Sequence, residues 1–220
     1  MQVLELFETK FIHFDFLPFT HIIIMTPERY NRLTSVLNHR QPDLTVILEN
    51  VFDPHNVSAV MRTCDAVGIQ DVYILNNRIP PHRKWGYRSS STAAKWLSIH
   101  QFTDAEECFK EVRNHYAKIY TSRLGPGASD LYSLDLTESI ALVFGNETFG
   151  VSDEIRRFSD GDFIIPQVGI IKSLNISVAC AVTLYEAFRQ KKEKGHYANR
   201  KVNAEAFRQL SDEWGIPQSQ

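Results

Sequence analysis

The stretch TVILENVFDPHNVSAVMRTCDAVGIQDVYIL, residues 45–75, contains one complete strand–helix–strand pattern. Its ends, Thr45–Glu49 and Val72–Leu75, are short apolar runs rich in β-branched residues, which is typical of strands buried on both faces. Between them, Asn56–Val67 repeats apolar residues at helical spacing, with Asn56 as the predicted N-cap and a glycine just after the last residue. The stretch therefore predicts two parallel strands joined by a helix.

The same alternation continues along the chain and predicts an α/β fold with a mostly parallel sheet flanked by helices. A long helix is predicted near the end of this domain, and one short helix on each side of it forms an N- or C-terminal extension. The further predicted strands are Trp96–His100, Lys118–Ser122, Ile140–Phe144 and Phe163–Ile165, and the further predicted helices are Asn175–Lys192, Pro27–Asn38 and Asn203–Glu213.

Composition limits the class of protein. The chain has 220 residues, of which 43% are hydrophobic, and a formal net charge of -2. These values are typical of a folded globular protein and exclude a polybasic chain, but they do not exclude a localised basic surface. Cys64, Cys108 and Cys180 lie far apart with no CxxC pair, so neither a zinc site nor a disulfide framework is indicated. We expect no bound metal and a reducing, cytoplasmic location.

The first residues differ from the rest of the chain. The segment Phe11–Met25 is apolar on average but contains His, Asp and Pro, and it is too short to span a bilayer. The opening MQVLELFE also lacks the basic start of a signal peptide. We therefore expect no membrane partner, and we interpret residues 1–24 as an upstream extension or a translation artefact, with the working protein starting near Met25.

Several common catalytic motifs are missing. No dinucleotide-binding glycine pattern follows the first predicted strand, and no GxxxxGK[ST] motif occurs. The eight histidines lack metal-ligand spacing, and Ser173 is not in a GxSxG setting. The sequence therefore argues against a Rossmann dehydrogenase, a P-loop NTPase, a metalloenzyme and a serine hydrolase.

Positive charge gathers at two places in the chain. The range 186–201 carries six Lys or Arg against two Glu, and Arg29, Arg32 and Arg40 add charge near the start of the domain. Basic residues in a last helical turn complement the helix dipole, so these clusters can be ordinary solvated helix ends. The alternative is a rim that binds phosphates.

Three polar segments each follow a predicted strand, where α/β sheets present their ligand-binding loops. They are Glu49–Gly68, Phe144–Glu154 and Ile165–Ala179. Each of their notable residues also has a purely structural interpretation. Asn56 and Asn175 can be helix caps, Arg62 an exposed helix residue, and Glu147 a turn acid.

Taken together and in order, the segments resemble a known family. The patterns N-x5-R within NVSAVMRTCDAVG, FGNExxG, and IPxxGxxxSLNxSVAxA look like the three motifs of the SpoU/TrmH-type RNA 2'-O-ribose methyltransferases of the SPOUT superfamily. The resemblance extends from about Arg29 to Lys192. It implies a deep trefoil knot in the C-terminal part of the domain, S-adenosylmethionine (AdoMet) bound in the knot loops, and an active site assembled at a homodimer interface.

The resemblance also implies roles for particular residues. Arg62 would hold the target phosphate and help to polarise the ribose hydroxyl, and Glu147 would tie the knot loop, while the other catalytic residues fix loop geometry and the ribose. The implied catalytic residues are Asn56, Arg62, Glu147, Ser173 and Asn175, and the implied AdoMet contacts are Ser122, Gly145, Ile165 and Leu174.

Short helical extensions at both ends resemble those of the tRNA (guanosine-2'-O)-methyltransferases that modify guanosine 18. The resemblance implies tRNA contacts at Arg29, Arg32, Arg40, Arg113, Arg189 and Lys191, and domain ranges of 25–41, 42–195 and 196–220 for the N-terminal extension, the methyltransferase domain and the C-terminal extension. Two alternatives stay open: a related enzyme acting on ribosomal RNA or another tRNA position, and a knotted RNA-binding protein without catalysis.

Overall fold

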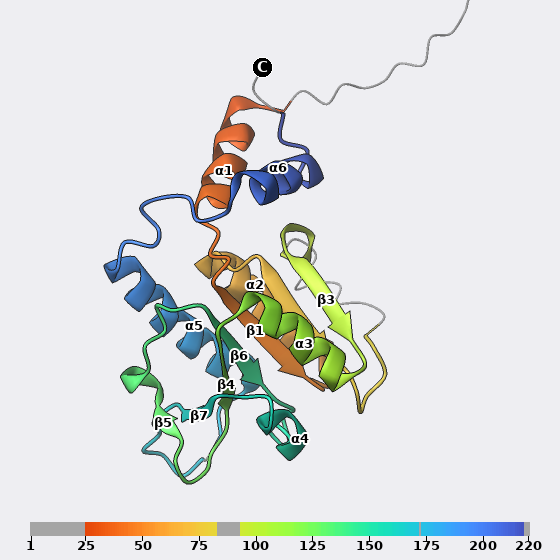
Figure 1. The fold of residues 1–220 in the computed structure, drawn as a ribbon, viewed down its shortest axis with the longest axis vertical. Coiled ribbons are helices and arrows are strands. Elements are labelled where there is room, and N and C mark those ends of the chain that lie inside the picture. The colour runs from red at the N-terminus through yellow and green to blue at the C-terminus, as the bar shows by residue number, and fades with distance from the viewer. Residues whose placement is uncertain (1–24, 83–92, 172, 218–220) are drawn as a thin grey trace, which may run out of the picture.

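The computed structural model describes residues 25–82, 93–171 and 173–217, so the extension interpreted at 1–24 lies outside the described residues. Within the described part, the strands form one seven-stranded sheet in the order β3-β2-β1-β6-β4-β7-β5, and every pair is parallel. The strands are β1 Leu44–Glu49, β2 Asp71–Leu75, β3 Ser98–Phe102, β4 Lys118–Ser122, β5 Ser129–Asp130, β6 Ile140–Phe144 and β7 Gly161–Ile164. The predicted α/β fold with a parallel sheet is confirmed (Figure 1).

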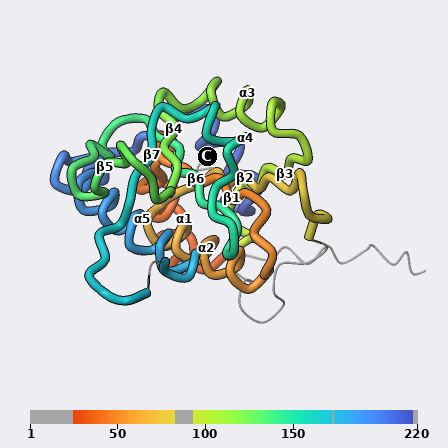
Figure 2. Tube along the Cα trace, turned by 90° about the horizontal axis from the view of Figure 1, so that it is seen from below, coloured from red at the N-terminus to blue at the C-terminus, as the bar shows by residue number. Residues whose placement is uncertain are grey.

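Helices cover both faces of the sheet (Figure 2). One face packs against α2 and α5 and the other against α3 and α4, as the two main core clusters show. The helices are α1 Pro27–Asn38, α2 Pro54–Val67, α3 Ala105–His115, α4 Asp153–Arg156, α5 Ile176–Glu193 and α6 Ala204–Glu213, with short 3-10 turns at Ala94–Trp96 and Leu131–Ser133.

The central strands explain why the sheet needs both layers. All residues of β1 and β6 are buried, and the two strands pair in register from Leu44 and Ile140. Successive side chains of a strand point to opposite faces. Val46 therefore belongs to the core beneath α2 and α5, and its neighbour Ile47 to the core beneath α3.

The start of α2 corrects one prediction. Asn56 is not the N-cap, because the helix begins at Pro54 and the Asp53 side chain accepts a hydrogen bond from the His55 N–H at 2.8 Å. Proline suits the first helical position, since its fixed φ matches a helix and its missing N–H is not needed there. Asn56 thus lies inside the first turn, and its side chain is available for other contacts.

Some of the other predicted element boundaries match the structure, and one differs from it. The predicted bounds of α1, β4 and β6 are confirmed, and Asn175 caps α5 as expected, accepting from the Ser177 N–H at 2.8 Å. The strand predicted at Trp96–His100 begins at Ser98, because Trp96 ends a 3-10 turn.

The two extension helices, α1 and α6, pack against each other at one end of the molecule (Figure 1). Their shared core contains Leu33, Leu37, Leu210 and Trp214. This pair stands apart from the end of the sheet at which the loops after β4, β6 and β7 lie (Figure 1).

Candidate active site

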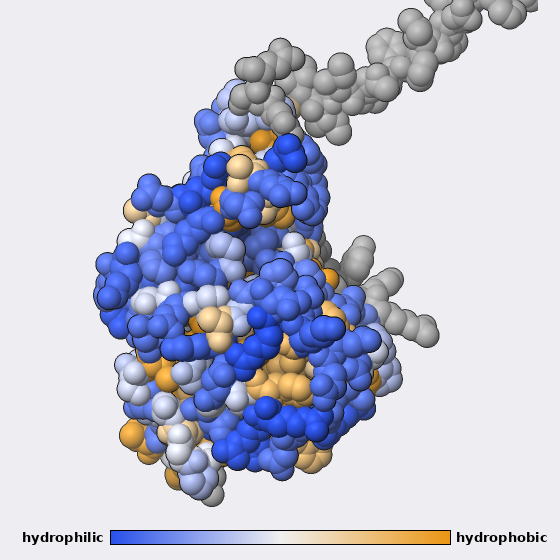
Figure 3. Space-filling model, viewed as in Figure 1, coloured by the Kyte–Doolittle hydropathy of each residue, from blue (hydrophilic) through white to orange (hydrophobic). Residues whose placement is uncertain are grey.

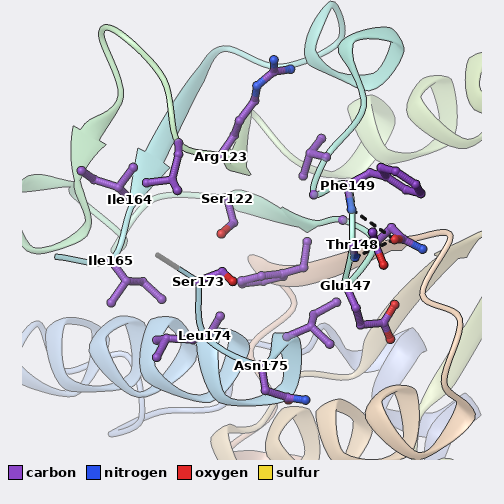
Figure 4. A pocket seen from close by; sticks show the side chains of 18 of the residues that line it. Ser122, Arg123, Glu147, Thr148, Phe149, Ile164, Ile165, Ser173, Leu174 and Asn175 are labelled. Atoms are coloured by element: carbon purple, nitrogen blue, oxygen red, sulfur yellow. Dashed lines mark hydrogen bonds between the residues drawn. The ribbon is translucent and has the colours of Figure 1, made fainter. Parts of the chain in front are cut away.

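A cavity of about 550 Å³ opens at the carboxyl ends of β4, β6 and β7. Parallel strands bring their carboxyl ends to one edge, so loops that are distant in sequence meet there. The four predicted AdoMet contacts, Ser122, Gly145, Ile165 and Leu174, all line it, as do the three predicted catalytic residues Glu147, Ser173 and Asn175. Figure 4 shows Ser122, Ser173 and Leu174 around its centre, with Ile165 on one side and Glu147 on the other.

The walls combine apolar surface with a few polar groups. Phe144 and Phe163 are buried in the sheet beneath the cavity, and Leu174, which is 37% exposed, offers apolar surface from the loop before α5. A cavity of this size that combines apolar walls with polar groups is typical of a site for a small organic ligand.

The loop after β6 is folded tightly on itself. Asn146 and Gly150 exchange backbone hydrogen bonds of 3.1 and 2.8 Å. A Cβ atom at Gly145 would lie 2.1 Å from the carbonyl carbon of Gly150, and Gly150 itself has φ +67°. Both glycines are therefore required for this turn, which projects Glu147 from its tip.

The Glu147 carboxylate accepts three hydrogen bonds from the segment that leads into α2. The donors are the backbone N–H of Phe52 at 3.1 Å, the backbone N–H of Asp53 at 3.3 Å and the side-chain amide of Asn56 at 3.0 Å. Burial opposes ionisation of the carboxyl, but the bonds from Asn56 and from backbone N–H groups outweigh it and lower the pKa of Glu147. Glu147 therefore joins the loop after β6 to the start of α2, which a simple turn acid would not do.

Asn56 also contacts the third polar segment. The Asn175 side-chain amide donates to the Asn56 Oδ1 at 3.2 Å, while the Asn175 Oδ1 caps α5. A continuous chain of hydrogen bonds thus runs Glu147–Asn56–Asn175 and joins residues up to 119 positions apart. The three polar segments that the sequence singled out meet at this point.

Arg62 lies elsewhere in the single chain. It is exposed on α2, six residues beyond Asn56, and it is not among the described residues that line the cavity. Six residues of helix advance about 9 Å and turn the side chain by roughly a third of a circle. One copy of the chain therefore does not bring Arg62 to the cavity wall.

The six predicted RNA contacts divide into three groups: two arginines are exposed on α1, two are exposed but form ion pairs, and two residues are buried. Arg29 and Arg32 are exposed on α1. Arg113 binds both carboxylate oxygens of Asp160, at 2.8 and 3.0 Å. Arg189 pairs with glutamates one turn away on either side along α5. Those four side chains reach solvent, whereas Arg40 and Lys191 do not.

The predicted tRNA contact at Arg40 is corrected by its burial, because the residue has no exposed surface. Its guanidinium donates to the carbonyls of Ile69 at 2.9 Å and Trp96 at 3.0 Å, and to the Asp65 carboxylate at 2.8 Å. It also lies 5.2 Å from the centre of the Trp214 ring. Arg40 therefore joins the helical pair to the α/β body, and its charge is not presented to a phosphate.

The predicted contact at Lys191 is corrected in the same way. Its side chain has no exposed surface, and its ammonium group lies 3.1 Å from the Asp43 carboxylate and donates to the carbonyls of Thr137 and Glu138. Burial lowers the pKa of Lys191, while Asp43 opposes that shift. Lys201 also pairs with Asp43, so part of the positive cluster in 186–201 is neutralised internally.

The sequence analysis did not identify three polar residues near the site, Asn50, Asn146 and Arg123. Asn146 donates from its side chain to the backbone carbonyl of Asn50 at 2.8 Å, and Asn50 itself adopts φ +50°. Arg123 lines the cavity beside Ser122. Asn50 follows a strand directly, a position where asparagine often takes the left-handed conformation, so it could have been found.

The described ranges, 25–82, 93–171 and 173–217, contain neither a candidate metal site nor a membrane-spanning helix. No group of three or more His, Cys, Asp or Glu residues there could hold a metal ion. No helix within these ranges is both long enough and apolar enough to cross a bilayer.

Comparison with known proteins points to one family. The model of the SpoU rRNA Methylase family matches residues 43–185. A tRNA (guanosine(18)-2'-O)-methyltransferase of Thermus thermophilus is 38% identical over 191 residues, which cover 86% of this chain and 96% of that protein. The crystal structure of the A. aeolicus TrmH/SpoU tRNA modifying enzyme matches with a TM-score of 0.79 and 35% identity, covering 85% of this chain and 94% of that one. The SpoU methyltransferase AviRb of Streptomyces viridochromogenes, in complex with AdoMet, gives a TM-score of 0.63 at 25% identity, covering 71% of this chain and 62% of that one. Because the family model spans well over half of the sequence, the chain belongs to the SpoU methylase family.

Proposed function

We propose that this protein methylates the ribose 2'-hydroxyl of guanosine 18 in tRNA, with AdoMet as the methyl donor. Family membership, the names of the relatives and the AdoMet complex of AviRb support this reaction. The observation that carries it is the hydrogen-bond chain Glu147–Asn56–Asn175, which joins the three motif segments beside the cavity.

The residues of the cavity suit AdoMet. The volume of about 550 Å³ lies within the usual range for small-ligand sites, and the combination of apolar and polar side chains suits a nucleoside. Ser122, Gly145, Ile165 and Leu174 would hold it. When bound, AdoMet supplies a methyl group on a positively charged sulfur, so the activation of the methyl group comes from the cofactor and not from the protein.

The protein then has to orient the ribose and assist loss of its proton. Ser173 and Asn175 lie at the cavity wall, and we assign them to fixing the ribose, with Asn56 holding both loops. Arg62 would bind the adjoining phosphate and polarise the hydroxyl. A guanidinium has a pKa above about 12, so the proton leaves to the phosphate or to water and not to Arg62.

We further propose that the protein is a homodimer. An apolar patch, defined as Val168, Ile170, Ile171, Val178 and Tyr185, is exposed on the loop after β7 and on α5. Val168 and Ile170 are essentially fully exposed, and Figure 3 shows apolar side chains near the end that carries β5 and β7. Apolar surface of this kind marks contact sites. A second copy of the chain covering the patch would bring another Arg62 into the assembly.

Two finer features of the fold are also proposals. The segment between β7 and α5 lines the cavity together with the loop after β6, and α5 then packs against α2, which supports a chain threaded as a deep trefoil knot. We propose a methyltransferase domain at 42–195 between helical extensions at 25–41 and 196–220. The buried free thiols of Cys64, Cys108 and Cys180 suit a reducing compartment, and we propose the cytoplasm.

For tRNA binding we retain Arg29, Arg32, Arg113 and Arg189. Phosphate contacts supply most of the sequence-independent affinity of such complexes, so exposed arginines are the suitable residues. We therefore expect tRNA affinity to fall steeply as salt concentration rises.

The reaction can be tested with unmodified tRNA transcripts and AdoMet carrying a labelled methyl group. We expect label in RNA, and a single new site resistant to alkaline cleavage at guanosine 18, since a 2'-O-methyl group blocks attack by that oxygen. Label at another tRNA position would refute the assigned target. Binding of tRNA without label would refute catalysis and favour an RNA-binding protein.

The family description favours one alternative, a ribosomal RNA substrate. Offering ribosomal RNA and tRNA in the same assay separates the two. Preferential labelling of ribosomal RNA would replace our assignment.

A further inference from the structure

Arg123 is the one cationic side chain among the described residues that line the cavity. Those residues include only two charged side chains, Arg123 and Glu147. Figure 4 shows Arg123 beginning next to Ser122 with its guanidinium pointing away from Leu174 and Asn175, while Glu147 lies on another side. An anionic group in this cavity therefore has one natural partner.

Glu147 is not the ion-pair partner of Arg123 in the described structure. Its carboxylate already accepts hydrogen bonds from Phe52, Asp53 and Asn56. Arg123 instead forms an ion pair with Asp153, whose Oδ1 lies 2.7 Å from Arg123 Nη1.

The pairing with Asp153 leaves Arg123 available. The Asp153 side chain is 88% exposed, so water screens its charge and weakens the pair. Arg123 Nη1 is buried and makes no hydrogen bond to any described residue, although the Asp153 oxygen is close to it. The Arg123 backbone is held in place, because its N–H donates to the Phe163 carbonyl at 3.1 Å. A fixed backbone thus carries a guanidinium with donors to spare at the edge of the cavity.

We propose that Arg123 binds the α-carboxylate of the methionine part of the cofactor, an assignment that rests on the proposed function. A guanidinium matches a carboxylate in shape and charge, and such bonds are roughly twice as strong as neutral hydrogen bonds. The carboxylate is the single negative group of AdoMet, and Arg123 is the single cation among the described residues that line the cavity. Asp153 holds the guanidinium near the rim until the ligand takes over.

The test compares two ligands that differ in this carboxylate. S-adenosylhomocysteine carries the amino-acid part, whereas 5'-methylthioadenosine lacks it, and isothermal titration calorimetry measures both affinities with the full chain. We expect Arg123→Gln to weaken S-adenosylhomocysteine about tenfold or more, the usual effect of losing a hydrogen bond to a charged group. The affinity for 5'-methylthioadenosine should stay the same. Arg123→Lys keeps the positive charge but loses the two-donor geometry of the guanidinium, so its loss of affinity for S-adenosylhomocysteine should be intermediate.

Asp153→Asn is the matched control. It removes the competing carboxylate without touching the guanidinium, so the affinity for S-adenosylhomocysteine should stay the same or rise. Equal losses for both ligands in Arg123→Gln, no loss for either, or a loss in Asp153→Asn as large as in Arg123→Gln would each overturn the assignment. If the wild-type protein binds neither ligand, the proposed function itself fails.

Discussion

Arg40→Met tests whether Arg40 is a structural link or an RNA contact. Arg40 has no exposed surface, and its guanidinium donates to Ile69, Trp96 and Asp65 while lying over the Trp214 ring. Methionine keeps much of the apolar stem but removes every donor. The two backbone carbonyls then lose a charged partner inside the protein, where no water replaces it.

The size of the effect follows from these contacts. Each hydrogen bond to a charged group contributes about 1.5–3 kcal/mol, and two backbone carbonyls lose one. Asp65 is 35% exposed and can be hydrated, so we assign it little of the loss. The two losses sum to about 3–6 kcal/mol, and we adopt about 3–5 kcal/mol, the range found for other broken buried pairs. In a chain of this length, each kcal/mol of lost stability lowers the melting temperature by about 2–4 °C. The melting temperature of Arg40→Met should therefore be lower than that of the wild type by roughly 6–20 °C.

The assay is thermal and urea denaturation followed by circular dichroism, with Arg32→Met as the matched control. Arg32 lies on α1 in the same part of the molecule but is exposed, so its loss should change stability by no more than about 0.5 kcal/mol. At a temperature where both variants are folded, Arg32→Met should weaken tRNA binding and Arg40→Met should not. An Arg40→Met protein that melts with the wild type and binds tRNA poorly would refute the structural role.

Three further expectations concern the loop after β6 and the apolar patch. Glu147→Gln should abolish methyl transfer and cost about 1–2 kcal/mol in the free energy of unfolding, because one amide oxygen replaces two carboxylate oxygens that accept three bonds; full activity with wild-type urea midpoints would contradict this. The lowered pKa of Glu147 means that its contribution to stability is present above its ordinary value of 4.5 and is lost as pH falls through the lower folded value. The urea midpoints of wild type and Glu147→Gln should therefore converge on acidification from pH 6, and a constant gap would exclude the carboxylate as its source. Ile170→Glu should halve the mass measured by light scattering without lowering the melting temperature of the monomer, since Ile170 is 99% exposed; an unchanged mass would place the dimer interface elsewhere.

The sequence predicts the sheet because strands that are buried on both faces appear as apolar runs. β1 and β6 are buried along their whole length, and an unbroken apolar run is the pattern that such strands show. The helix α3 was missed although its signal is local. Asp104 caps it, and Ala105, Cys108, Phe109 and Val112 form its buried stripe at helical spacing. The start of α2 was also readable, since an aspartate followed by proline marks the first turn.

The burial of Arg40 and Lys191 could not be read in this way. The sequence around a basic residue does not indicate which groups it will bind in the folded protein. Here the partners come from distant segments: Arg40 bonds to Asp65 and Trp96, and Lys191 to Asp43. Charge alone places such residues at the surface. The candidate site shows the opposite case, because Asn56, Glu147 and Asn175 belong to three motifs, and the strands before these motifs all end at one edge of the sheet.

The position of Arg62 leads to a test of the assembly itself. One chain does not bring Arg62 to the cavity wall, so we expect the Arg62 of one copy to serve the cavity of the other. Arg62→Ala and Asn175→Ala should each be inactive alone. Mixed after unfolding and refolding, they form heterodimers in which one site combines an intact Arg62 with an intact cavity. With random pairing, half of the dimers are mixed and half of their sites are complete, so activity should return to about a quarter of the wild-type value. If Arg62 acts within its own chain, every site in the mixture keeps one defect and activity stays absent, which would contradict a shared site while leaving the dimer intact.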